Sequence, residues 1–591
     1  MKRKAIVSCA LAAAVAGAVS VGMYQTSQAS QVDAGISRFS VEYDVRPENI
    51  DGKLLSVNVQ IKPVKLSAQK TVYLNNGNVS SSNPTCTDSS GKKVAASESD
   101  EVWEIGPIPE NASYVNFNYT VKLGEGSPDD AQVNGFMASD LLAFQGKYVL
   151  MLPWLDSKDI EQTEKYITGV TFKMTGSQQW NTVMPFVEAN SQEKTFQISA
   201  PTWYDFYDIG NSGYCFGSFS PLTASAEGKE ITFYLDQGVK STANPDDLNL
   251  VMAFYNYYAK AFGTGLQNYP IVLLRSDENG NAILGGVSGK TMALSLGMAD
   301  ADACQTMSRT IYHAFFDSLV TARNLRYQPA LWLYDGLANY YVDASAQALS
   351  GKMQQKYGIA LQDDTNRKYL RYLYLYLSIE DPSMMSVSPD MEGKMTSIQE
   401  EFYFDTKVPL ILGTIEKSAG QDAVVHYLIR QKAHQDIDIS GMMKDLLGAN
   451  EPALRQYFSG ASFIPDYWGL SGEAIGRQEI LTELSAAENE IADFYQQQNT
   501  SYANEELQLI RGDVLEQEIK NRKLSFGSRE TEDMVKKYSD TLYLLLMQNS
   551  LRANLCGIKD PGALGAKEKI YSEENTQKWL SYAEKTGYQN G

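Results

Sequence analysis

The spacing of apolar residues changes once along this chain, and that change limits what the chain can fold into. From about residue 36 to 225, short runs such as FSVEYDV, LLSVNVQIKP and YVNFNYTVKL alternate apolar and polar residues between Gly, Asn, Ser and Pro. A period of two is typical of strands with one buried face. We therefore predict an antiparallel β-sandwich domain at residues 30–228, and nothing in it suggests chemistry.

Helical spacing dominates the rest of the chain. After the strand-like segments KEITFYLDQG and YPIVLL come long runs with a helical period, among them CQTMSRTIYHAFFDSLVTARN and ALWLYDGLANYYVDASAQAL. Residues 462–591 are polar and amphipathic, as in DMVKKYSDTLYLLLMQNSL. Because 591 residues are too many for one core, we predict an α+β multidomain protein with a mostly helical domain at 229–461 and a helical C-terminal domain at 462–591.

The first 29 residues have the pattern of an export signal. MKRK precedes the apolar run AIVSCALAAAVAGAVSVGMY, and small and polar residues follow it up to Ala29. The alternative is a retained N-terminal anchor, because the apolar run is about as long as a thin membrane span. We predict a secreted or extracytoplasmic protein that would be attached to a membrane only if this anchor is retained.

Charge and cysteine spacing argue against two kinds of binding site. The net charge of −20 argues against a nucleic-acid groove, which needs clustered Lys and Arg. The four cysteines after the leader have no CxxC spacing, so no zinc ribbon is expected, and their pairing stays open.

Two further segments invite a ligand and are given plainer interpretations. GGVSGKT at 285–291 lacks the spacing of a phosphate-binding loop, since Leu284 stands where the first Gly is required. It is read as a tight turn before the strand MALSLG. PTWYDFYDIG at 201–210 is read as an aromatic-rich loop that covers a sheet edge.

The segment HAFFD at 313–317 lies in an expected helix and carries the strongest chemical signal. In a zinc-peptidase helix of the form HExxH, the two histidines lie on one face and bind the metal, and the Glu activates the bound water. Here the corresponding residues are His313, Ala314 and Asp317. One ligand position is kept, the base is missing and the second ligand is changed.

The later segment LWLYDGLANYY, whose Asp335 lies eighteen residues after Asp317, resembles the WLxEGxAxYY helix of aminopeptidase N and glycyl aminopeptidase-like gluzincins, which supplies a third, glutamate ligand. Asp335 occupies the position of that Glu. The resemblance covers most of residues 36–460 and implies a thermolysin-like, mostly helical catalytic-type domain.

Two more segments follow the same family in order. GGVSGKTMALSLG resembles its substrate-binding edge strand, Gly-Gly-x-Glu, with Gly285 and Gly286 kept and Ser288 in place of the Glu. FDTKVPLILGTIEKSAG resembles the Tyr-x-Lys-Gly helix whose tyrosine stabilises the oxyanion. Counting back from the lysine places Asp405 at that tyrosine, with Tyr403 two residues away.

These substitutions fall on the base, the ligands, the substrate anchor and the oxyanion donor of one reaction. We therefore predict a catalytically degenerate member, with the catalytic positions Ala314 and Asp405 not intact and no cofactor. Its expected function is to bind a peptide or protein segment in the former cleft, which Gly285, Gly286, Ser288 and Tyr403 would line.

Three alternatives stay open. His313, Asp317 and Asp335 together offer an imidazole and two carboxylates to one divalent metal, zinc or manganese, which would make the chain an atypical metallo-aminopeptidase. Alternatively, His313 and Asp317 form a local structural pair, since Ala314 cannot act as a general base. The third is a structural envelope protein whose cleft is filled. His426 and His434 have no HxxxH partner and are expected to be structural.

Overall fold

The computed structural model describes residues 37–357, 372, 403–452 and 512–586, apart from gaps at 68–69, 77, 100, 125–133, 155–162, 177–178, 227, 240–244, 278–281, 298–300, 327–329, 434, 525–527, 559–568 and 570–571. The chain forms two compact units. The β-rich unit comprises Met1–Arg323, Ala344–Tyr357 and Val425–Gln435, and the helical unit comprises Asn324–Asp343, Gly358–Val424 and Asp436–Gly591. Each unit is described separately, and the predicted domain ranges stay predictions.

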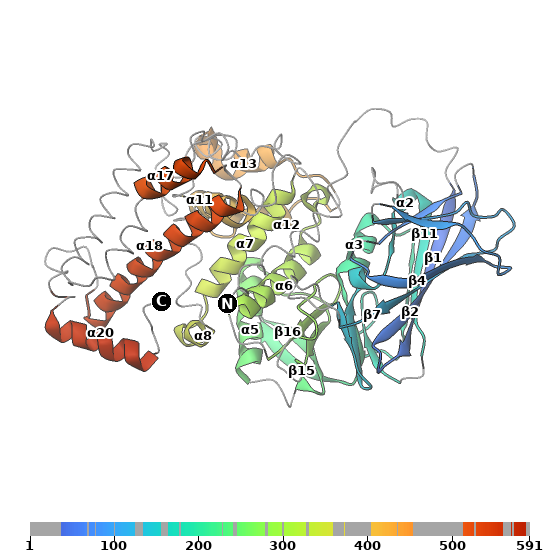
Figure 1. The fold of residues 1–591 in the computed structure, drawn as a ribbon, viewed down its shortest axis with the longest axis horizontal. Helices are drawn as coiled ribbons and strands as arrows, with labels where there is room; N and C mark the ends of the chain where they lie inside the picture. Colours follow the sequence, from blue (N-terminus) through green and yellow to red (C-terminus); the bar gives the residue numbers. More distant parts are fainter. Residues whose placement is uncertain are drawn as a thin grey trace. The chain divides into compact units, whose positions relative to one another are not determined.

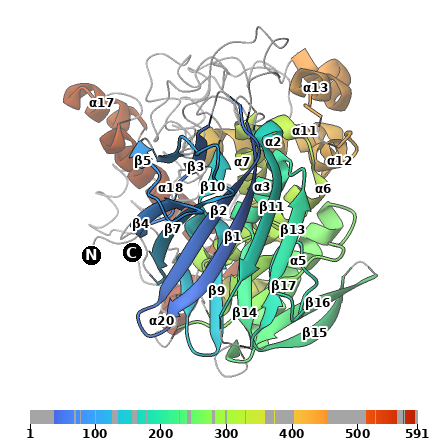
Figure 2. The same cartoon turned by 90° about the vertical axis from the view of Figure 1, so that its right-hand side faces the viewer.

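A six-stranded sheet is the largest element of the β-rich unit (Figure 2). Its order is β13-β11-β1-β2-β7-β4. All its described pairings are antiparallel except that of β1 with β11, which is parallel. The predicted antiparallel sheet is therefore correct apart from this pair. The strands are β1 (Arg38–Asn49), β2 (Leu54–Lys65), β4 (Ser81–Asp88), β7 (Val115–Lys122), β11 (Ile167–Met174) and β13 (Thr195–Ser199).

Two four-stranded sheets complete the sandwich and share one core with the large sheet. Tyr43 and Phe117 of the large sheet belong to the same buried cluster as Trp103 of the second sheet and Tyr214 of the third. The second sheet has the order β10 (Leu152–Trp154), β3 (Val72–Asn75), β6 (Val102–Ile105), β5 (Ala96–Ser99). The third has the order β12 (Asn181–Val183), β14 (Gly213–Gly217), β9 (Leu141–Gln145), β8 (Gly135–Met137).

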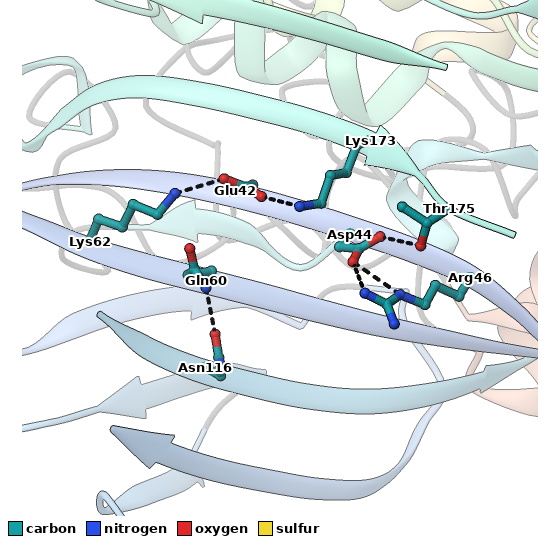
Figure 3. A network of polar contacts seen from close by, with 8 residues as sticks. All are labelled: Glu42, Asp44, Arg46, Gln60, Lys62, Asn116, Lys173 and Thr175. Carbon is teal, nitrogen blue, oxygen red and sulfur yellow. Dashed lines mark hydrogen bonds and ion pairs between the residues drawn. The ribbon is translucent and has the colours of Figure 1, made fainter. Parts of the chain in front are cut away.

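The outer face of the large sheet is polar, as its period of two requires (Figure 3). Glu42 accepts hydrogen bonds from Lys62, at 2.7 Å, and from Lys173, and these contacts hold the pKa of its carboxyl below the usual value. Gln60 of β2 donates to Asn116 of β7 at 3.1 Å. Cross-strand polar pairs of this kind keep one side of the sheet in water while the other packs on the core.

A fourth sheet in the same unit leads towards the predicted site. Its order is β15 (Phe219–Ala226), β16 (Lys229–Asp236), β17 (Ile271–Leu274), β18 (Met292–Ser295), and β16, β17 and β18 are parallel. Helix α5 (Pro245–Ala261) connects β16 to β17. The turn and strand predicted around GGVSGKTMALS are confirmed, and β18 is at the end of the sheet's strand order.

Helices make up most of the remaining described chain (Figure 1), so the predicted α+β organisation, with a β N-terminal region and helical later parts, is confirmed. They are α2 (Thr163–Tyr166), α3 (Trp203–Asn211), α6 (Ala301–Leu319), α7 (Leu331–Gln347), α8 (Gly351–Lys356), α11 (Val408–Ala419), α12 (Ala423–Ile429), α13 (Ile439–Leu447), α17 (Gly512–Arg522), α18 (Arg529–Leu555) and α20 (Glu573–Thr586). Shorter turns are the 3-10 helices η1 (Gly146–Tyr148), η3 (Arg323–Arg326) and η8 (Gly448–Asn450), and the π-helix η7 (Tyr403–Lys407). Within the described ranges, no helix is both long and apolar enough to span a membrane.

Candidate functional site

Helix α6 carries the HAFFD segment in the β-rich unit. Its aromatic residues anchor it to α5, with ring centroids 4.9 Å apart for Tyr255 and Phe315 and 5.8 Å apart for Tyr258 and Tyr312. This packing fixes the rotation of the helix. Ala314 is fully buried, while His313 and Asp317, one turn apart, are each 9% exposed.

The loop before β18 runs against α6 one turn before His313. Gly286 has φ of +124°, and a Cβ atom at this position would lie 2.5 Å from Oγ1 of Thr310. Only glycine therefore combines this backbone conformation with this close approach. The predicted cleft residue Gly286 thus lies against the helix that carries His313, and Gly285, Gly286 and Ser288 are all half-buried.

The turn after Ser288 is held by the end of α3. Oγ of Ser212 accepts a hydrogen bond from the backbone N–H of Lys290 at 2.8 Å and donates to the carbonyl oxygen of Asp208 at 2.5 Å. The Lys290 ammonium also pairs with the Asp208 carboxylate at 3.3 Å. These contacts fix the backbone of the loop against the end of α3.

Tyr269 lies just before β17, and its hydroxyl is buried. Burial raises the pKa of its hydroxyl well above the usual value, and the carboxylates of Asp317 and Asp208 raise it further, while the backbone of Gly289 lowers it. The hydroxyl therefore stays protonated throughout the ordinary pH range.

Asp208, Ser212 and Tyr269 have no place in the predicted site, and one sequence signal could have indicated the first of them. The interpretation of PTWYDFYDIG as a loop was wrong, because residues 203–211 form α3. Thr202 and Asp205 make a capping box, in which each side chain accepts a hydrogen bond from the other residue's backbone N–H. This T-x-x-D spacing marks a helix start and places Asp208 on it.

In the helical unit, α7 holds the π-helix that precedes α11. The Asn339 side chain donates to Oδ1 of Asp405 at 2.5 Å and to the carbonyl oxygen of Phe404 at 2.9 Å. Asp335 is half-buried one turn before Asn339, on the same face of α7. Asn339 therefore holds Asp405 against α7, the helix that also carries Asp335. The Tyr403 side chain lies outside what the structure describes.

A buried lysine follows Asp405 in the same π-helix. Lys407 is fully buried, and burial lowers the pKa of its ammonium to about 7. Its charge is therefore easily lost near neutral pH, since desolvation disfavours the protonated form.

The three residues expected to share a metal are divided between the two units. His313 and Asp317 belong to the β-rich unit and Asp335 to the helical unit, so the three-ligand set stays a prediction. In the described part of the chain, no group of three or more His, Cys, Asp or Glu side chains is placed to hold a metal ion. The four described cysteines form no disulfide with one another. His426 lies half-buried in α12, whereas His434 is not described.

Comparison with known proteins gives no match to any family model and none to any curated protein. Among solved structures, an aminopeptidase N family protein from Idiomarina loihiensis is similar, with 13% identity and a TM-score of 0.43, over 75% of this chain and 78% of that one. A mutant M1 zinc metallopeptidase from Deinococcus radiodurans, bound to a Tyr-Ser-Ala substrate, has 14% identity and a TM-score of 0.43, over 73% and 95% of the two chains.

A third similar structure is a two-domain M1 zinc metallopeptidase mutant bound to L-arginine, at 15% identity and a TM-score of 0.41, over 75% of this chain and 96% of that one. The structural neighbours are thus aminopeptidase N-like zinc metallopeptidases, the group that the motifs around His313 and Asp335 resemble.

Proposed function

We propose that this chain is an exported, catalytically inactive homologue of zinc peptidases that binds a peptide or protein segment in the former active-site region. The observation that carries the proposal is Ala314. It is fully buried between His313 and Asp317, at the position where the reaction needs a carboxylate to take a proton from water. A methyl group cannot do this, and general-base catalysis typically contributes about 10²–10⁴-fold in rate.

The oxyanion position gives a second, independent support. Asp405 stands where a tyrosine hydroxyl would donate to the developing negative charge, and it already accepts a hydrogen bond from Asn339. An ionised carboxylate repels an oxyanion instead of stabilising it. Both halves of the reaction, proton removal and charge stabilisation, would therefore be lost.

Peptide binding needs a rigid, accessible surface but no catalytic groups, and the loop around Ser288 provides such a surface. Gly286 against Thr310 and Ser212 against Lys290 fix the backbone of the loop, while Gly285 and Ser288 stay partly accessible. A rigid, partly exposed loop can bind an extended peptide with little loss of conformational entropy. We propose that this loop contacts the ligand.

The main test is a metal analysis of the purified full chain, followed by aminopeptidase assays with and without added zinc, manganese and cobalt. We expect no turnover in any of these conditions. Turnover with stoichiometric metal that His313→Ala abolishes and His426→Ala preserves would establish the competing function, an atypical metallo-aminopeptidase. The buried placement of His313 and Asp317 on one helix face is the observation that favours this competitor.

Binding is tested separately with a peptide array and the variants Ser288→Trp and Asp335→Ala. We expect at least one of them to weaken capture of the best peptides by about tenfold, which corresponds to roughly 1.4 kcal/mol. Thr223→Ala, at an exposed position of β15, is the control and should bind as the wild type. Unchanged capture by both cleft variants, with circular dichroism showing them folded, would count against the proposal.

Export is tested by expressing the full chain with its leader and sequencing the N-terminus of the protein recovered outside the cytoplasm. Cleavage near Ala29 is the expected result. An intact leader on membrane-bound protein would instead indicate the anchored form.

A further inference from the structure

Two buried carboxyl groups meet at one tyrosine hydroxyl in the helical unit. The hydroxyl of Tyr341, on α7, lies 3.1 Å from Oε1 of Glu416 at the end of α11 and 3.0 Å from Oδ1 of Asp422 in the turn that follows. Glu416 is 5% exposed and Asp422 is 9% exposed. These three residues are called the carboxyl cluster below.

The hydrogen atoms available to the carboxyl cluster do not suffice if both acids are ionised. A phenol has one hydrogen and can make one full hydrogen bond as donor. Two carboxylates at about 3 Å from the same phenol oxygen therefore leave one contact without a hydrogen, in a site with little water. If one carboxyl is protonated, it donates to the phenol oxygen and both contacts are satisfied.

The other contacts of Glu416 use its second oxygen. Oε2 accepts from the backbone N–H of Asp422 at 3.0 Å and from the hydroxyl of Tyr340 at 3.2 Å. Burial raises the pKa of Glu416 to about 7 and the Asp422 carboxylate raises it too, whereas the Asp422 N–H and the two tyrosines lower it.

Among the described residues of the neighbouring elements, few charged side chains face this site. Lys417 of α11 and both Lys444 and Asp445 of α13 are exposed. Asp343 lies two residues beyond Tyr341, which on a helix is the opposite side. Glu451, buried beyond the carboxyl end of α13, is another acid.

We propose that Glu416 and Asp422 together hold one proton and that losing it loosens the contact between α7 and α11. The same two helices meet where Gly336 packs on Val408 and where Asn339 holds the π-helix with Asp405. Release of the proton would thus alter the part of the proposed site that contains Asp335 and Asp405. The inference does not depend on whether that site binds a peptide.

The direction of the pH effect follows from linkage. The pKa of Glu416 is raised from its usual 4.5 to about 7 in the folded chain, so the folded state binds more protons than the unfolded state between these values. The stabilisation from the cluster is fully present below about pH 4.5 and is lost as the pH rises through about 7.

The test is hydrogen–deuterium exchange of the full chain between pH 5 and pH 9, corrected for the intrinsic exchange rate. We expect the amides of α7 and α11 to lose protection as the pH rises in the wild type. Glu416→Gln, which keeps a neutral side chain of the same shape, should lose this dependence, while the exposed control Asp445→Asn should keep it. A wild-type profile in Glu416→Gln, or no dependence in the wild type, would overturn the proposal.

A second measurement needs no variant. Infrared spectra of the wild type should contain the carbonyl stretch of a buried, protonated carboxyl at pH 6, and this band should disappear as the pH is raised through about 7. Absence of the band at pH 6 would rule out the shared proton even if Glu416→Gln failed to fold.

Discussion

At the residue scale, Gly336 is where α7 comes closest to the start of α11. A Cβ atom at this position would lie 2.1 Å from Cγ1 and 2.9 Å from Cβ of Val408. Helix α7 carries Asp335, and α11 directly follows the π-helix that carries Asp405. The distance between the two helices therefore affects the positions of Asp335 and Asp405.

We predict that Gly336→Ala lowers the free energy of unfolding by about 1–3 kcal/mol, because the added methyl group overpacks this contact. In a helix with free space around the glycine, replacing it with alanine raises the free energy of unfolding by up to about 1 kcal/mol. Urea unfolding of both variants measures the difference, with Gly351→Ala in α8 as the control, since nothing lies within 4 Å of its added Cβ. Equal behaviour of the two variants would contradict the close packing.

At the scale of elements, α3 connects the sandwich to the loop of the proposed site. It begins with the capping box of Thr202 and Asp205 and ends beside Ser212, which binds the backbone of Lys290. The helix start therefore influences the position of the loop through one short rigid element.

We predict that Thr202→Ala destabilises the chain by about 0.5–2 kcal/mol, the usual contribution of an N-terminal cap. It should also increase amide exchange in residues 203–211 and in the 288–291 loop, as measured by mass spectrometry. Thr223→Ala, in an exposed part of β15, should change neither region. Loosening of α3 with an unchanged loop would separate the two elements and disprove the coupling.

At the scale of the whole molecule, 71 acidic residues against 51 basic ones leave a net charge of −20. An excess of one sign destabilises a compact chain by self-repulsion, and dissolved salt screens that repulsion over a Debye length of about 10 Å at 0.1 M.

We predict that adding sodium chloride at pH 7 shifts urea unfolding to higher urea concentrations. Near the pI of about 4.8 the net charge vanishes, so the same addition should have little effect there. Circular dichroism at both pH values provides the measurement. A salt effect of equal size at the two values would attribute the stabilisation to something other than net charge.

The sequence by itself determined the order of elements and the helices of the proposed site. Alternation predicted the sandwich, and helical spacing predicted α6 and α7, because these patterns arise from the backbone geometry of each element. The pairing of β1 with β11 in parallel was not predictable in this way, since both strand directions give the same alternation.

Only the tertiary structure decided which side chains meet. Gly286 approaches Thr310, and Asn339 holds Asp405. Tyr341 of α7 contacts both Glu416 and Asp422, which are close to each other in the sequence but far from Tyr341. No local pattern encodes these contacts, because burial and hydrogen bonding between distant residues depend on how whole elements pack. The residues at 313–317 by themselves led to the prediction that the groups of one reaction had been replaced, whereas the side chains that lie against this helix were decided by the tertiary structure alone.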